Sequence, residues 1–269
     1  MAKKANILWQ FYNFSGKMGV SKAANVWALT FIVNQNTPLM KTNFIFPMIF
    51  ILAAGRVTAQ ECATFFPFDK GAALEYTHYD DKGKVMLVSN QKVVMIDDAG
   101  ADGLTAQVDV VMLDKNGKEQ TKGNYKVTCK ASTLYMDITA TMPQMTQSFS
   151  QMEMQMTGDQ LQLPAKLSVG QALPDAHMEI KAGSGGVNLM KMTIDVTERK
   201  VEGKEMITTP TGAYEAYKIS YMTSTKMLVG KNFKTIAWYA PKVGMVKQES
   251  YDKKGNLENS MVLTKFSKQ

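Results

Sequence analysis

Methionine is the residue type whose number and spacing point most directly to chemistry. The chain contains 21 methionines, and three of them, Met152, Met154 and Met156, alternate with Glu153 and Gln155. A β-strand places alternate residues on one face, so three thioethers are expected on the concave, apolar side and the two polar side chains on the outer side. Three interpretations stay open: a soft Cu(I) site, an adaptable surface for apolar ligands, and simple core packing.

A second pair, Met190 and Met192, has the same spacing and alternates with Lys191 and Thr193. We include this pair with Met152, Met154 and Met156 as candidate ligand-binding residues.

Histidine is too scarce for the common catalytic and metal-binding constellations. The chain has two, His78 and His177, and contains neither an H-E-x-x-H nor a G-x-S-x-G motif. We expect His78 to be exposed or half-buried, just before a turn, and His177 to lie in a loop or at a strand start. These features predict a protein that is not an enzyme, with no metal site and no cofactor.

Adjacent carboxylates are the remaining candidates for acid–base chemistry. The pairs Asp80/Asp81 and Asp97/Asp98 are expected in hairpin turns, where aspartate is favoured because it accepts local backbone hydrogen bonds. Turn formation is therefore the preferred interpretation of both pairs.

The two cysteines, Cys62 and Cys129, predict a disulfide if the chain is exported, because oxidising compartments favour bonded pairs. Cys129 lies on the same strand face as Tyr125 and Val127 and should point inward. The alternative is two unpaired thiols. Lipidation of Cys62 is disfavoured, because Glu61 rather than a small residue precedes it.

The N-terminal region has the order of a secretory signal. A basic start at Met40–Lys41 precedes the apolar run 44–54, and small residues end at Ala59. Eleven apolar residues are too few for a membrane-spanning helix, which needs about 20. We predict a signal peptide over 40–59, cleavage after Ala59 and an over-extended N-terminus over 1–39, with a membrane anchor as the weaker alternative.

Charge separates the leader from the rest of the chain. Residues 1–59 hold six basic and no acidic side chains, so residues 60–269 carry 25 basic against 24 acidic. The nearly equal numbers of basic and acidic side chains in residues 60–269 do not indicate a nucleic-acid-binding protein, which needs a basic face on the folded domain.

Period-two hydrophobicity dominates residues 60–269 and predicts an all-β domain. Apolar and polar residues alternate over 104–112, 190–197 and 217–221, so each segment is expected to have one buried and one solvent-exposed face, which is typical of antiparallel sheets. Turns with an Asp-x-x-Gly core recur at Asp80, Asp114 and Asp252. We predict one domain over 60–269: an antiparallel meander curled into an open barrel or half-barrel, with an irregular central insertion over 142–187 that includes a short helix at 142–151.

Three stretches together resemble a known family. They are Glu61–Tyr76 (ECATFFPFDKGAALEY), Thr209–Ile219 (TPTGAYEAYKI) and Trp238–Lys247 (WYAPKVGMVK). With the signal peptide and the turns, this chain resembles the TapB-like family of uncharacterised exported proteins, found mostly in Bacteroidetes, over essentially all of residues 60–269. The resemblance implies a curled antiparallel meander and supplies no catalytic residues.

The sequence therefore predicts a periplasmic or otherwise exported protein that binds without catalysis. A lipid, a lipoprotein or an envelope protein is the expected partner, with membrane contact only through the uncleaved signal peptide and no nucleic acid. The alternatives are a structural or assembly factor without a small ligand, and a Met-rich Cu(I)-binding protein. A deep apolar groove would favour a carrier, whereas a filled core would favour an assembly factor.

Overall fold

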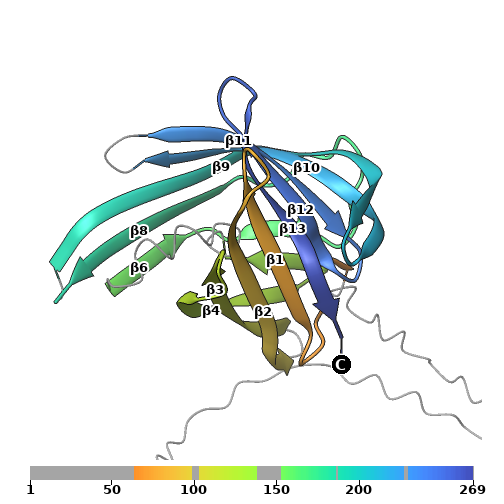
Figure 1. Cartoon of the computed structure of the whole chain (residues 1–269), viewed down its shortest axis with the longest axis horizontal. Coiled ribbons are helices and arrows are strands. Elements are labelled where there is room, and N and C mark those ends of the chain that lie inside the picture. Colours follow the sequence, from red (N-terminus) through yellow and green to blue (C-terminus); the bar gives the residue numbers. More distant parts are fainter. Residues whose placement is uncertain (1–63, 99–102, 138–152, 186, 227–229, 269) are drawn as a thin grey trace, which may run out of the picture. The chain divides into compact units, whose positions relative to one another are not determined.

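Thirteen strands form one antiparallel sheet in the computed structural model of this chain (Figure 1). The structure describes residues 64–98, 103–137, 153–185, 187–226 and 230–268, all within one unit, Gly55–Gln269. The strands are β1 (Ala73–Asp80), β2 (Val85–Asp98), β3 (Leu104–Asp114), β4 (Glu119–Lys130), β5 (Thr133–Met136), β6 (Glu153–Gly158), β7 (Leu161–Pro164), β8 (Ala176–Ser184), β9 (Val187–Thr209), β10 (Gly212–Lys226), β11 (Lys231–Ala240), β12 (Gly244–Tyr251) and β13 (Leu257–Ser267).

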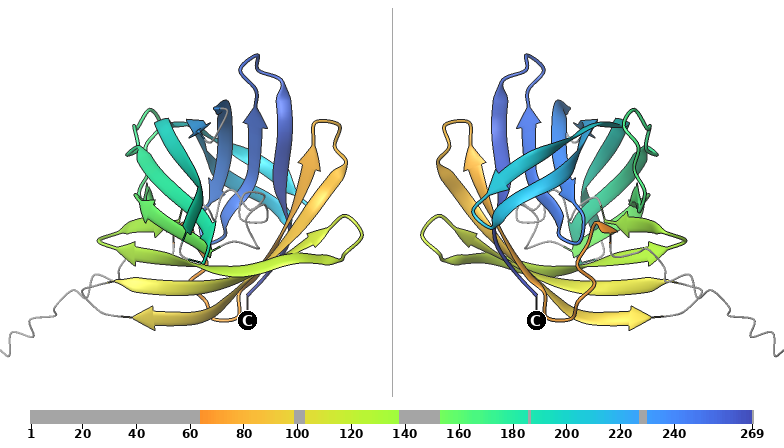
Figure 2. Two further views of the ribbon diagram at one scale, coloured as in Figure 1. Left: turned by 90° about the vertical axis from the view of Figure 1, so that its left-hand side faces the viewer. Right: turned by 90° about the vertical axis from the view of Figure 1, so that its right-hand side faces the viewer.

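The sheet is a meander for most of its width. Its spatial order is β6-β8-β9-β10-β11-β12-β13-β1-β2-β3-β4-β5-β7, so most neighbours are also consecutive in the chain. It curls strongly (Figure 2), and its two ends, β6 and β7, are joined by only Asp159 and Gln160 without being ladder partners. The predicted open, curled antiparallel meander is confirmed.

The Asp-x-x-Gly turns are the local cause of the meander. In the β3–β4 turn, the Asp114 carboxylate accepts backbone N–H bonds from Asn116 and Lys118 at 2.8 and 2.9 Å. Gly117 has φ +82°, a conformation that glycine adopts at low cost. The turns at Asp80 and Asp252 repeat these bonds, which lower the pKa of each aspartate.

The expected period-two faces are present. In β3, Ala106 and Val108 are fully buried, and in β9 the same holds for Ile194 and Val196. These side chains point to the inner face of the curl and form one hydrophobic core with residues from β4, β5, β7, β8, β10 and β11. A second buried cluster surrounds Trp238 and Val246 and includes Leu74, Tyr76 and Leu263.

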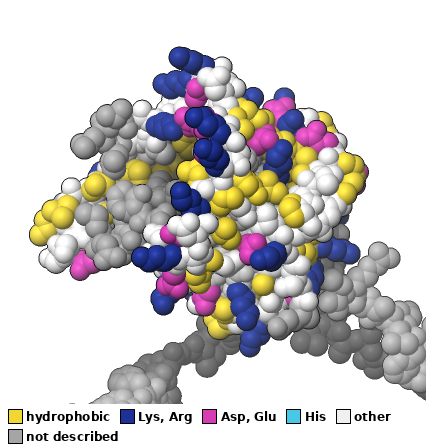
Figure 3. Space-filling view, viewed as in Figure 1, with side chains coloured by type: hydrophobic (Ala, Val, Ile, Leu, Met, Phe, Trp, Pro, Cys, Tyr) yellow, Lys and Arg dark blue, Asp and Glu magenta, His cyan; other side chains and the backbone are white. Residues whose placement is uncertain are grey.

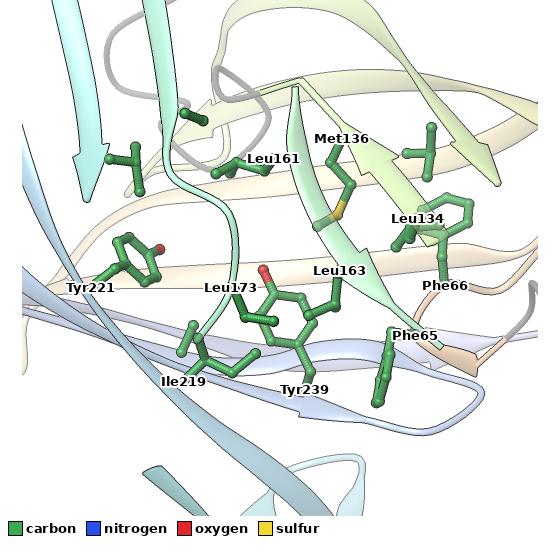
Figure 4. Close-up of a cluster of buried hydrophobic side chains, with 14 of the residues drawn as sticks. Phe65, Phe66, Leu134, Met136, Leu161, Leu163, Leu173, Ile219, Tyr221 and Tyr239 are labelled. Carbon is green, nitrogen blue, oxygen red and sulfur yellow. The ribbon is translucent and has the colours of Figure 1, made fainter. Parts of the chain in front are cut away.

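Segments outside the ladder fill the interior of the curl. Phe65 packs edge-on against Tyr217 and Tyr239, with ring centroids 5.7 and 6.5 Å apart. Phe66, 7% exposed, packs edge-on against Phe68, and Figure 4 shows it beside Leu134. The core therefore depends on the residues that immediately precede β1.

The central stretch is more regular than predicted. Residues 142–187, expected to be an irregular insertion, contain β6, β7 and β8, and Leu163–Pro164 ends a strand that pairs with β5. Pro164 is tolerated because β7 is the last strand of the sheet. Residues 168–171 form a turn, with Gln171 N–H donating to the Ser168 carbonyl at 3.0 Å. The helix predicted for 142–151 lies outside the described residues.

Candidate functional site

The strands β6, β8 and β9 form an arm that carries the candidate methionines. The β8–β9 hairpin projects to one side of the sheet (Figure 1), and β6 pairs with β8 along its outer edge. Gly185, with φ +59°, occupies the tight connection at the hairpin tip.

Strand register places Met156, Met190 and Met192 on one face of the arm. Two rows of cross-strand partners run across the three strands, and partners in a row point to the same side of a sheet. One row is Met156–Ile180–Met192, and the next pairs Ala182 with Met190.

Burial changes along this face from the centre of the sheet to its edge. Met192 is 6% exposed and belongs to the core, and Met190 is partly buried against it. Met156, on the edge strand, is 42% exposed although its partner Ile180 is 3% exposed. We define the Met face as Met156, Met190 and Met192 together with Ile180; Met152 and the side chain of Met154 lie outside what the structure describes.

The other face of the arm is charged. Glu179 accepts ion pairs from Lys181 at 3.1 Å and Lys191 at 2.6 Å, and these bonds lower the pKa of its carboxyl group. The arm is therefore amphipathic, with one apolar and one charged side.

The hairpin tip adds exposed apolar area. Val187 is 61% and Leu189 64% exposed. Figure 3 shows apolar side chains gathered at the projecting end where this hairpin lies. Contiguous exposed apolar area of this kind marks interaction surfaces in soluble proteins.

The interior beside Phe65 and Phe66 leaves little room. A cavity of about 40 Å³ remains there, lined by Tyr76, Tyr125 and Tyr239 among others. Ligand pockets have volumes of roughly 300–1,000 Å³. Figure 4 shows Leu163 and Leu173 beside the ring of Tyr239. This part of the curl is therefore a filled core.

The two histidines lie on different strands and in different environments. His78 is 3% exposed, so the expectation of an exposed or half-buried side chain is wrong: it lies on the inner face of β1 between its ladder partners Leu87 and Met261. Burial lowers its pKa to about 4. His177 is exposed on β8, with its Nδ1 2.6 Å from an Asp195 carboxylate oxygen.

Acid–base and metal candidates are few in the described residues. Asp80 is in a turn as expected, but Asp97 and Asp98 end β2 and pair with β3, so their predicted turn position is wrong. Within the described ranges, no cluster of three His, Cys, Asp or Glu side chains could hold a metal ion. The same ranges contain no helix with the length and hydrophobicity that a bilayer crossing requires.

Cys129 points inward as predicted and is 1% exposed. Its ladder partners are Leu104 and Leu134. Cys62 and the predicted signal peptide lie outside the described residues, so the disulfide and the cleavage site stay predictions.

Comparison with known proteins identifies a family and a fold. The family model described as DUF3108-like matches residues 69–263. A protein of Bacteroides fragilis, described as a candidate exported protein with a YmcC-like fold, superimposes with a TM-score of 0.67 at 23% identity, covering 77% of this chain and 100% of its own. A candidate lipoprotein of Parabacteroides distasonis gives the same TM-score and identity, covering 77% of this chain and 99% of its own. No curated protein matches.

These matches agree with the predicted type of fold. The TapB-like name is not returned, so that finer assignment stays a prediction. At 23% identity the two structures establish the shared fold of the curled sheet.

Proposed function

The chain belongs to the DUF3108-like family, and from this premise we propose that it is an exported, non-enzymatic envelope protein that docks a partner protein on the Met face of its arm. Two features support export: the signal-like order of residues 40–59, and the descriptions of similarly folded proteins as a candidate exported protein and a candidate lipoprotein. The predicted TapB-like membership fits the same picture.

One observation carries the docking proposal: the inner face of the arm changes from core to open surface without losing its apolar character. Ile180 and Met192 are buried, whereas Met156 in the same cross-strand row is 42% exposed. Methionine is flexible and polarisable, and is common on surfaces that accept varied apolar partners.

A protein partner is favoured over an enclosed small ligand by the packing of the interior. Phe65 and Phe66 leave about 40 Å³, too little for an acyl chain, whereas the Met face is open at its edge. An apolar segment of a partner would cover Met156 and continue the core. An acyl chain lying on the same face is the competing occupant, and Cu(I) bound by thioethers is the third.

A titration of the purified protein separates these occupants. The wild type and the triple variant Met152→Ser, Met154→Ser, Met156→Ser are titrated with a fluorescent fatty acid and with Cu(I), and each variant is melted. We expect the triple variant to bind either probe no more weakly than the wild type does, and its melting temperature to stay close to that of the wild type.

Each alternative has a distinct signature in this experiment. Saturable fatty-acid binding that the variant loses identifies an acyl-chain surface, and tight Cu(I) binding that it loses identifies a copper site. If the triple variant loses several kcal/mol of stability, Met152, Met154 and Met156 belong to the core, since each buried methionine lost costs about 2 kcal/mol or more. Any of these three results contradicts the docking proposal.

A further inference from the structure

A bulge between β9 and β10 opens a second site, away from the Met face. The β9–β10 ladder pairs Ser220 with Lys200 and Met222 with Thr197, so Tyr221 has no partner on β9. Opposite it, Glu198 adopts φ +55°, a left-handed conformation that is uncommon for residues other than glycine. β-Bulges of this kind bend the strand that carries them and often lie next to functional sites.

The bulge forms one wall of an open pocket of about 410 Å³. This volume lies within the range of small-molecule sites. The pocket is lined by Ala172, Glu198, Arg199, Lys200, Glu202, Ser220, Tyr221, Met222 and Lys234.

Arg199 supplies a buried positive charge at this pocket. It is 6% exposed, and its two terminal nitrogens donate to the carbonyls of Pro174 at 2.6 Å and Gln162 at 3.0 Å. Its Nε–H is shielded from solvent and has no acceptor. In the described residues no carboxylate lies within ion-pair distance of this guanidinium, although buried charges are normally paired.

The exposed charges at the pocket also favour an anion. Within the described ranges, the ammonium groups of Lys200 and Lys234 form no ion pair. Glu202 opposes them, but one of its oxygens already accepts the Ser220 hydroxyl at 2.6 Å. With Glu198 included, the five ionisable side chains of the pocket carry three positive and two negative charges.

Apolar groups complete the walls. Ala172, Tyr221 and Met222 also line the pocket. A ligand that matches this surface carries an anionic oxygen group on a short apolar body.

We propose that the β9–β10 bulge pocket binds a small amphiphilic anion, with its carboxylate or phosphate group between Lys200 and Lys234 and its charge complementing the buried positive charge of Arg199. Guanidinium and ammonium groups bind such oxygens through charge-assisted hydrogen bonds. This site does not depend on the docking proposal, because none of its residues belongs to the arm's Met face.

Calorimetric titration of the purified protein with octanoate and with octyl phosphate tests the proposal. We expect saturable binding of at least one probe, and no binding of octanol, which lacks the anionic group. Stronger binding of octyl phosphate would assign the site to phosphate groups, and stronger binding of octanoate to carboxylates.

Variants locate the binding in this pocket. Lys200→Met with Lys234→Met should weaken binding about tenfold or more, because the variant loses both ammonium groups that donate charge-assisted hydrogen bonds to the anion. Glu202→Gln should strengthen it by removing a like charge. The matched control, Lys115→Met with Lys253→Met in two distant turns, should leave it unchanged. Both lysine pairs are exposed, so folding is preserved in each variant.

The opposite results overturn the proposal. The first is the absence of saturable binding of both anionic probes at concentrations up to about 10 mM, because a dissociation constant above that value corresponds to a binding free energy of less than roughly 3 kcal/mol. The second is that octanol binds as tightly as the anionic probes. The third is that the pocket variant and the control variant weaken binding equally.

Discussion

The guanidinium of Arg199 on β9 donates to the carbonyl oxygen of Gln162 on β7 at 3.0 Å, and this bond joins strands that are far apart in the order of the sheet. β7 is one end of the sheet, and β9 is the third strand from the other end. Arg199 also binds Pro174, which precedes β8. This buried side chain thus links β7, one end of the unclosed curl, to β9 near the other end.

Replacing Arg199 should therefore destabilise the fold. We expect Arg199→Met to lower the free energy of unfolding by about 3 kcal/mol, because two carbonyl oxygens lose charge-assisted hydrogen bonds while the apolar stem is kept. Urea denaturation measures the loss, with Lys200→Met, exposed on the same strand, as the control. A change below about 0.5 kcal/mol, typical of surface substitutions, would show that the tie contributes nothing.

Two glycines should differ in their tolerance of alanine. At Gly117 a Cβ would meet no atom within 4 Å, so Gly117→Ala carries only the cost of φ +82°, about 1 kcal/mol. At Gly103 a Cβ would lie 2.3 Å from the Cys129 carbonyl oxygen, so the backbone must move. Gly103→Ala should cost several times more in thermal denaturation, and equal melting temperatures for the two variants would contradict this packing.

His78 should make stability depend on acidity. Burial lowers its pKa from 6.5 to about 4, so only the unfolded chain takes up a proton between these values. Stability should be full above pH 6.5, fall as the pH drops toward 4 and level off below it, by up to roughly 3 kcal/mol. Urea midpoints measured across this range should lose that step in His78→Gln. A step of the same size in the variant would assign the effect to other groups.

The predicted Cys62–Cys129 bond gives a further test. Intact mass before and after alkylation without reductant should show no free thiol. Cys129→Ser and Cys62→Ser should each lose about 4 kcal/mol by the chain-entropy model. The double variant should be no less stable than the less stable single one. Two alkylated cysteines in the unreduced protein would refute the bond.

Local patterns predicted the long strands well, and failed where pairing partners are distant in sequence. The Asp-x-x-Gly turns and period-two faces of β3, β9 and β10 depend on neighbouring residues, so the sequence alone reveals them. The short strand β7 contains Pro164 and exists because it pairs with β5, about 30 residues away. No local pattern carries that information.

The site residues show the same division. Alternation along β1 from Leu74 through Tyr76 to His78 carried the signal that His78 is buried. The inward position of Arg199 could not be predicted, because the bulge at Glu198 shifts the alternation by one residue between Val196 and Val201. The backbone conformation at the bulge decides which face of the sheet Arg199 points to, and the alternation of apolar and polar residues does not reveal that conformation.

Site-specific photocrosslinking in the protein's own host tests most directly whether the Met face docks a partner protein. A photoreactive residue replaces Met156, 42% exposed, and in the matched control Met86, 46% exposed on β2. We predict a discrete protein adduct at position 156 whose purified partner binds the wild type more tightly than the Met156→Ser variant, and no such adduct at position 86. Equal labelling at both positions, or a partner that binds wild type and variant equally, would contradict the account.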